Sequence, residues 1–147
     1  MTTTFDFQDG NGSVPAHQHP NGGGWVADTA RVEETAIVGP DAQVSGNARV
    51  YDKARVSGNA QVYGDAVVFG DAVVYSNARV FGDARVYDNA VVSGNARVFG
   101  NAWVFGDAVV SGNAWVFDKA QVFDIAWVYG NARVYDDDRV SGNVFVF

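Results

Sequence analysis

The chain has 147 residues, a hydrophobic fraction of 48%, a formal charge of −7 and no cysteine. This length suits a single domain, and the hydrophobic fraction is too high for a disordered chain. The absence of cysteine excludes disulfides and thiolate metal sites, and the negative charge argues against nucleic acid or an anionic membrane as the main partner.

The beginning of the sequence, MTTTFDFQDG, has neither the basic region nor the apolar region of a secretory signal peptide. No run of about 18 apolar residues follows that would form a membrane-spanning helix. We therefore expect a soluble protein without a signal peptide, located in the cytoplasm or associated with a virion.

Residues 1–24 are predicted to form an irregular N-terminal cap. Pro15, Pro20 and the glycines 22–24 indicate a non-repetitive chain that crosses the open end of the core behind them. His17 and His19 lie two residues apart in this cap, and they are weak candidates for metal ligands. The alternative interpretation is that both histidines belong to the cap structure alone.

Residues 25–147 repeat with a period of six. Valine occurs at every sixth position from Val26 to Val146, and alanine keeps the same period two positions earlier, from Ala30 to Ala132. In an Ala-x-Val triplet the alanine and valine share one face of a short strand. The pair that follows, such as Gly-Asn or Gly-Asp, tolerates the positive φ of a tight corner. Each hexad is therefore predicted to be a short strand followed by a corner.

Three hexads, which make 18 residues, are predicted to close one triangular coil around the buried valines. Six to seven such coils, stacked as parallel strands about 4.8 Å apart, would form a rod of roughly 32 Å. One column of corner residues, spaced by 18, consists of Asn59, Asn77, Asn95, Asn113 and Asn131. We expect these asparagines to form hydrogen bonds along the rod axis.

Hexads such as VSGNAR, VYGDAV and VFGDAR resemble the hexapeptide repeat of the trimeric hexapeptide acyltransferases, over about four-fifths of the chain. The resemblance implies an all-β fold, namely a left-handed parallel β-helix, or triangular β-solenoid. The left hand comes from the resemblance alone, because ordinary crossovers between parallel strands are right-handed. The N-terminal stretch FDFQDGNGSVPAHQHPNGGGWV also resembles the start of uncharacterised hexapeptide-repeat proteins of bacteria and phages.

The family resemblance also implies what an enzyme of this kind needs. Hexapeptide acyltransferases use a histidine general base in a cleft between subunits. Here the only histidines are His17 and His19, which precede the first coil, and no insertion interrupts the hexads to build a pocket. We therefore predict a protein that is not an enzyme and binds no cofactor. The alternative is an acyltransferase whose general base is a histidine of the cap.

Two outward columns of aromatic residues follow the 18-residue spacing. The first ladder consists of Tyr63, Phe81, Phe99, Phe117 and Tyr135, and the second ladder consists of Tyr51, Phe69, Tyr87, Phe105 and Phe123. Three tryptophans, Trp103, Trp115 and Trp127, fall on three different faces, and the chain ends with the sequence VFVF, which contains Phe145 and Phe147. Stripes of this size exceed what a monomer normally exposes.

We predict that these aromatic residues form an interface between copies of the chain, in a trimer, a dimer or an end-to-end stack through an open last coil. Two alternatives remain open. The aromatic rings can stabilise one another under the aliphatic stems of neighbouring arginines. They can also bind a glycan, as a module of a phage fibre would.

Overall fold

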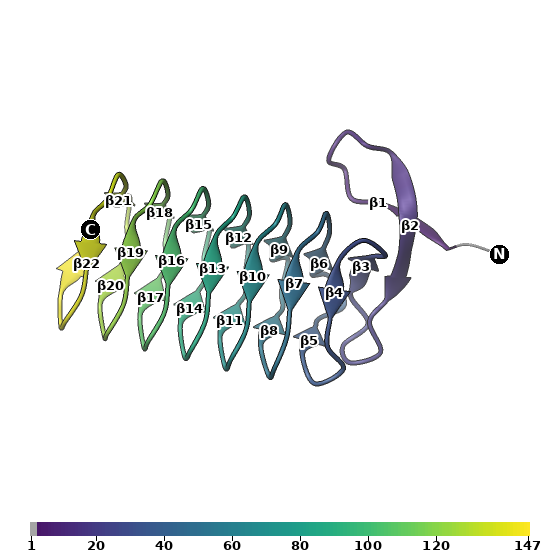
Figure 1. Ribbon diagram of the computed structural model, residues 1–147, viewed down its shortest axis with the longest axis horizontal. Coiled ribbons are helices and arrows are strands. Elements are labelled where there is room, and N and C mark those ends of the chain that lie inside the picture. The colour runs from purple at the N-terminus through teal and green to yellow at the C-terminus, as the bar shows by residue number, and fades with distance from the viewer. Residues whose placement is uncertain (1–2) are drawn as a thin grey trace.

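The computed structural model describes residues 3–147, and in it three sheets wrap around one axis to form a rod with the N-terminus at one end (Figure 1). All the described elements are strands, so this part of the chain has no helix that is long and apolar enough to cross a membrane. Twenty-one short strands, β3 to β23, make up seven coils, with one strand of each coil in each sheet. The predicted all-β solenoid is confirmed.

Sheet 1 has nine strands, of which the first two precede the coils. They are β1 (Thr4–Asp6), β2 (Ser13–Gln18), β3 (Trp25–Ala27), β6 (Gln43–Val44), β9 (Gln61–Val62), β12 (Arg79–Val80), β15 (Arg97–Val98), β18 (Trp115–Val116) and β21 (Arg133–Val134).

Sheets 2 and 3 have seven strands each. Sheet 2 contains β4 (Arg31–Val32), β7 (Arg49–Val50), β10 (Val67–Val68), β13 (Arg85–Val86), β16 (Trp103–Val104), β19 (Gln121–Val122) and β22 (Arg139–Val140). Sheet 3 contains β5 (Ile37–Val38), β8 (Arg55–Val56), β11 (Val73–Val74), β14 (Val91–Val92), β17 (Val109–Val110), β20 (Trp127–Val128) and β23 (Phe145–Val146).

The register explains why a six-residue repeat produces this shape. Within the coils, strands pair in parallel with residues 18 positions away, as Val80 pairs with Val62 on one side and with Val98 on the other. The repeated valines and alanines fill the interior, and from Ala36 to Val128 they are essentially inaccessible to solvent. Valine suits this position because its branched side chain is stiff and packs well on a pleated surface.

The corners have the backbone conformation that the turn pairs predicted. From Gly46 to Gly142, every sixth residue has φ between 56° and 72°. Most of these residues are glycines. Aspartates stand at some of the other corners, and four of their carboxylates accept a hydrogen bond of 3.0–3.2 Å from a backbone amide in the corner of the next coil, namely those of Asp52, Asp88, Asp118 and Asp124. The predicted hydrogen bonds between stacked asparagine side chains are present between Asn95 and Asn113 and between Asn113 and Asn131.

The N-terminal segment is more regular than the sequence indicates. Strands β1 and β2 form an antiparallel hairpin, and β2 pairs antiparallel with β3, so the hairpin extends sheet 1 beyond the first coil (Figure 1). The hairpin has a small core of its own, in which Phe7 and Ala16 pack with Ala27. The irregular parts are the turn of the hairpin, residues 7–12, and residues 19–24, which form hydrogen bonds with the backbone of Val38 and so cover the N-terminal edge of sheet 3.

Candidate interaction surfaces

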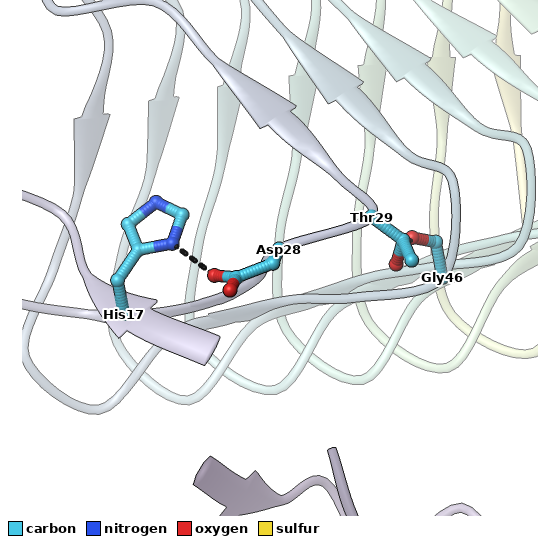
Figure 2. Close-up of polar contacts among 4 residues, drawn as sticks. All are labelled: His17, Asp28, Thr29 and Gly46. Atoms are coloured by element: carbon cyan, nitrogen blue, oxygen red, sulfur yellow. Dashed lines mark hydrogen bonds and ion pairs between the residues drawn. The ribbon is translucent and has the colours of Figure 1, made fainter. Parts of the chain in front are cut away.

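The two histidines of the N-terminal segment occupy different environments. His17 lies on β2 and Asp28 follows β3, and the His17 imidazole Nδ1 is 2.7 Å from the Asp28 carboxylate Oδ1 (Figure 2). About half of each side chain is exposed, so this pair contributes little to stability. The carboxylate accepts the Nδ1 hydrogen bond and so orients the imidazole, and the Nε2 atom makes no hydrogen bond within the described residues. Beside the pair, the Thr29 hydroxyl donates a hydrogen bond to the carbonyl of Gly46 (Figure 2).

His19 is a buried structural residue. Only 3% of it is accessible, and its Nε2 donates a hydrogen bond to the carbonyl of Ala36 at 2.8 Å. This bond fixes the proton on Nε2, which is then unable to bind a metal ion. Residues 3–147 contain no group of three or more histidine, aspartate or glutamate side chains that could hold a metal ion.

The two aromatic ladders are stacks of nearly parallel rings. In the first ladder, Tyr63, Phe81, Phe99 and Phe117 follow one another with ring centroids 4.9–5.0 Å apart and interplanar angles of at most 2°. From Phe69 to Phe123 the second ladder has the same centroid distances and interplanar angles of at most 4°. Each ring covers its neighbours, so most ladder residues are only partly exposed, although Tyr135 remains 44% exposed. Mutual stacking therefore accounts for much of the aromatic surface.

The three tryptophans differ in their surroundings. Trp115 lies in one column with Arg97 and Arg133, whose guanidinium carbons are 5.3 Å and 4.2 Å from its ring centroid. Trp103 has Arg85 at 5.3 Å in the same way. Both tryptophans are thus partly covered by cations. Trp127 has no such neighbour within the described residues, and 48% of it is exposed.

Sheet 3 has an outward face that differs from those of the other two sheets. From β11 to β23 its outward strand positions carry no charged side chain, and they are Val73, Tyr75, Val91, Ser93, Val109, Ser111, Trp127, Tyr129, Phe145 and Phe147. Sheets 1 and 2 have arginines at the corresponding positions. A hollow of about 280 Å³ lies between Trp127, Tyr129 and Phe145, and Phe145 and Phe147 are 59% and 82% exposed. The exposed apolar surface is therefore concentrated on sheet 3, near the last two coils.

The two ends of the rod also differ. At the N-terminal end the hairpin continues sheet 1, and residues 19–24 bond with Val38 of sheet 3. At the other end β21, β22 and β23 are edge strands, and no described strand pairs with their far side. In each coil the outward residues donate backbone hydrogen bonds to the following coil, as Phe99 does to Val116. The last described coil therefore presents free backbone donors.

Burial changes the acidity of one ladder residue. Desolvation within the second ladder raises the pKa of the Tyr87 hydroxyl above its usual value, the charge of Asp88 raises this pKa further, and the charge of Arg85 opposes the shift. The neutral phenol is thus favoured in the folded protein.

The seven stacked coils, with one buried Ala–Val pair in almost every strand, define a β-solenoid repeat protein. The family model of the YdcK beta solenoid repeat matches residues 42–58, 60–76, 78–94, 92–106 and 126–142, which together make up more than half of the sequence. The chain belongs to this family. No curated protein and no solved structure is significantly similar to it. The resemblance to hexapeptide acyltransferases and the left hand of the coil stay predictions.

Proposed function

We propose that the protein is a non-enzymatic structural rod that associates with further copies of itself through the outward face of sheet 3. The observation that supports this proposal is the exposed, uncharged and largely apolar surface that runs from β11 to β23 and ends at Trp127 and Phe145. A flat surface of valines, serines and aromatic rings allows another flat surface to approach closely. By contrast, two faces that carry arginines could approach closely only if their guanidinium groups moved apart or paired with opposite charges.

The corners on either side of sheet 3 favour one orientation of the two copies. One edge is acidic, with Asp71, Asp88, Asp107 and Asp124 exposed, and the other edge carries Asn77, Asn95, Asn113 and Asn131. When two rods lie parallel about a two-fold axis along their length, the acidic edge of one meets the asparagine edge of the other. An antiparallel pair would bring the two acidic edges together, which is unfavourable.

The size of the face sets the expected affinity. Five strands about 4.8 Å apart, each roughly 16 Å from corner to corner, give a projected area of roughly 400 Å² for each copy. This is at the low end for specific interfaces. We therefore expect a dimer that forms at high protein concentration and dissociates on dilution.

Light scattering over a range of protein concentrations tests this proposal with three variants. Val109→Glu places a carboxylate in the centre of the sheet 3 face and should keep the protein monomeric. Val67→Glu is its matched control at the same strand position of sheet 2, where Arg49 and Arg85 are neighbours 18 residues away. Phe99→Lys probes the first ladder, the interface that the sequence predicts.

Each result has a distinct meaning. A parent protein that dimerises, together with a monomeric Val109→Glu variant and unchanged controls, supports the sheet 3 interface. Loss of association in Phe99→Lys or Val67→Glu, but not in Val109→Glu, moves the interface to the ladder faces. A mass that grows without limit indicates end-to-end contacts at the last coil. A strict monomer at all concentrations rejects self-association.

A second candidate function rests on the His17–Asp28 pair. An imidazole that is oriented by a carboxylate and has a free Nε2 is the arrangement of a general base, which would remove a proton from an amine or hydroxyl that attacks a thioester. Release of free thiol from an acyl thioester in the presence of an acceptor measures this activity. His17→Ala should abolish it, whereas Asp28→Asn should reduce it. Thiol release that is equal in the parent and in His17→Ala rejects this role.

A further inference from the structure

A groove of about 380 Å³ lies between the turn that joins β1 to β2 and the outward face of sheet 1. Its floor consists of side chains from three successive coils, namely Gln43, Ser45, Gln61, Tyr63 and Arg79, and Asp9 of the turn forms part of its wall. This volume falls within the range of small-molecule sites. The groove lies on sheet 1, whereas the proposed self-association face lies on sheet 3, so the two sites share no residue.

The first ladder begins inside this groove. One face of the Tyr63 ring stacks on Phe81, with the centroids 4.9 Å apart and the rings parallel. On the other side, 18 residues earlier, the ladder position is occupied by Ser45. Phe81 is the only aromatic ring that stacks on Tyr63 within the described residues. Phe7 and Gln8 of the turn also line the groove, and Ser45 is only 8% exposed. A ring-shaped ligand would therefore lie between the turn and the second face of the Tyr63 ring, beside Ser45.

Polar groups surround this open ring face. The amides of Gln43 and Gln61 lie in one column with the guanidinium of Arg79, in strands that pair directly with one another. None of these three side chains makes a hydrogen bond or an ion pair within residues 3–147. The Asp9 carboxylate, in contrast, accepts hydrogen bonds from the backbone and side chain of Asn11. The groove thus offers free amide donors and acceptors and one unpaired cation.

We propose that this groove binds a pyranose sugar that bears a carboxylate. The apolar face of a pyranose stacks on an aromatic ring, and its hydroxyl groups need the directional donors and acceptors that Gln43 and Gln61 supply. The carboxylate of the sugar pairs with Arg79 in bidentate fashion. The charge of Asp9 disfavours the reversed orientation of the sugar.

Calorimetric titration with methyl β-D-glucuronide and with methyl β-D-glucoside tests the proposal, because the two sugars differ only at C6, where the first has a carboxylate and the second a neutral hydroxymethyl group. We expect the glucuronide to bind and the glucoside to bind at least about tenfold more weakly, the factor that a charge-assisted hydrogen bond supplies. No heat from either sugar at millimolar concentration overturns the proposal. Equal affinities overturn the assignment of the carboxylate to Arg79.

Two variants locate the site, and the unfolding of each is compared with that of the parent. Ser45→Phe continues the first ladder with a ring of the protein's own, of the type already present at Phe81, Phe99 and Phe117, and it should abolish binding. Tyr51→Ser is the control, since Tyr51 begins the second ladder outside the groove. Retained binding in Ser45→Phe, in a variant that unfolds like the parent, places the sugar elsewhere and overturns the proposal.

Arg79→Gln tests the carboxylate contact, because glutamine already occupies the same column at Gln61. It should lower the affinity for the glucuronide about tenfold or more and leave the affinity for the glucoside unchanged. Arg97→Gln, which removes a guanidinium from Trp115 in the next coil, should change neither affinity. An equal loss in both arginine variants would indicate attraction by overall charge, which contradicts a built contact.

Discussion

Replacement of Gly64 by alanine or by aspartate measures what the corner carboxylates contribute. Gly64 has φ of +68°, and a Cβ atom placed there lies 2.9 Å from the backbone nitrogen of Gly82 in the next coil. Gly82 has little freedom to move away, because its carbonyl accepts a hydrogen bond of 2.9 Å from the amide of Asp65, the residue that follows Gly64. Both substitutions carry this steric cost, but only aspartate also brings an acceptor.

The magnitudes follow from the same corner in other coils. A left-handed conformation costs alanine about 1–2 kcal/mol, and the close contact adds to this, so we expect Gly64→Ala to lower the free energy of unfolding by about 2 kcal/mol. Asp118, in the same column of corners, has the same conformation and accepts a hydrogen bond from the Asp136 amide at 3.2 Å. A bond to a charged acceptor contributes about 1.5 kcal/mol at the lower end of its range. Gly64→Asp should therefore be destabilised by only about 0.5 kcal/mol.

Thermal and urea unfolding, followed by circular dichroism, distinguish the two variants. For a chain of this size 1 kcal/mol corresponds to about 2–4 °C in Tm, so the alanine variant should melt about 4–8 °C below the parent and the aspartate variant within about 2 °C of it. If aspartate is as destabilising as alanine, the carboxylate–amide bonds between coils contribute nothing, and our account of the corners is wrong.

Three further predictions concern the core, the second ladder and the N-terminal segment. Val98→Ala in the fully buried interior should lower the free energy of unfolding by about 2 kcal/mol in urea titrations, because the stacked coils cannot collapse into the space. The raised pKa of Tyr87 stabilises the folded protein fully below about pH 10, and this stabilisation is lost as the pH rises through the folded-state pKa. Tyr87→Phe should therefore flatten the alkaline decline of Tm, and an unchanged decline contradicts the cause given. His19→Ala removes the bond to the Ala36 carbonyl and should speed amide hydrogen exchange in residues 19–24 while leaving the later coils protected; uniform acceleration along the rod would show that the effect is global.

The interior of the rod was predictable because the residues of each hexad determine the local backbone conformation and which of its side chains are buried. An Ala-x-Val triplet followed by a turn pair defines a strand and a corner without reference to distant residues, and 18-residue spacing then assigns every side chain to a face. The stacking of Phe81 on Tyr63 and the bond between Asn95 and Asn113 follow from that spacing.

The surface was less predictable because it depends on what lies 18 residues away and on the non-repetitive segment. Trp115 and Trp127 look alike in sequence, but only Trp115 has arginines on both sides in its column. In the N-terminal segment the prolines and glycines indicated irregular chain. Pro15 nevertheless fits within β2, because β2 needs no amide hydrogen at this position. The Pro15 carbonyl accepts a hydrogen bond from the Asp28 amide, and the hydrogen bond toward β1 is donated by the Ala16 amide to the Thr3 carbonyl. The alternation of Phe5 with Phe7 and of Val14 with Ala16 was the signal for the hairpin.

The 18-residue register makes distance and direction along this molecule separately adjustable by insertion and deletion. Removal of 18 residues from the middle coils would bring the groove at Tyr63 and the apolar patch at Trp127 closer by one step of about 4.8 Å and keep both on their present faces. Removal of six residues would instead turn everything that follows by one side of the triangle, so that Trp127 would move from sheet 3 to sheet 2. Insertion or deletion of a hexad therefore changes the direction in which a site faces, whereas insertion or deletion of a whole coil changes the distance between two sites.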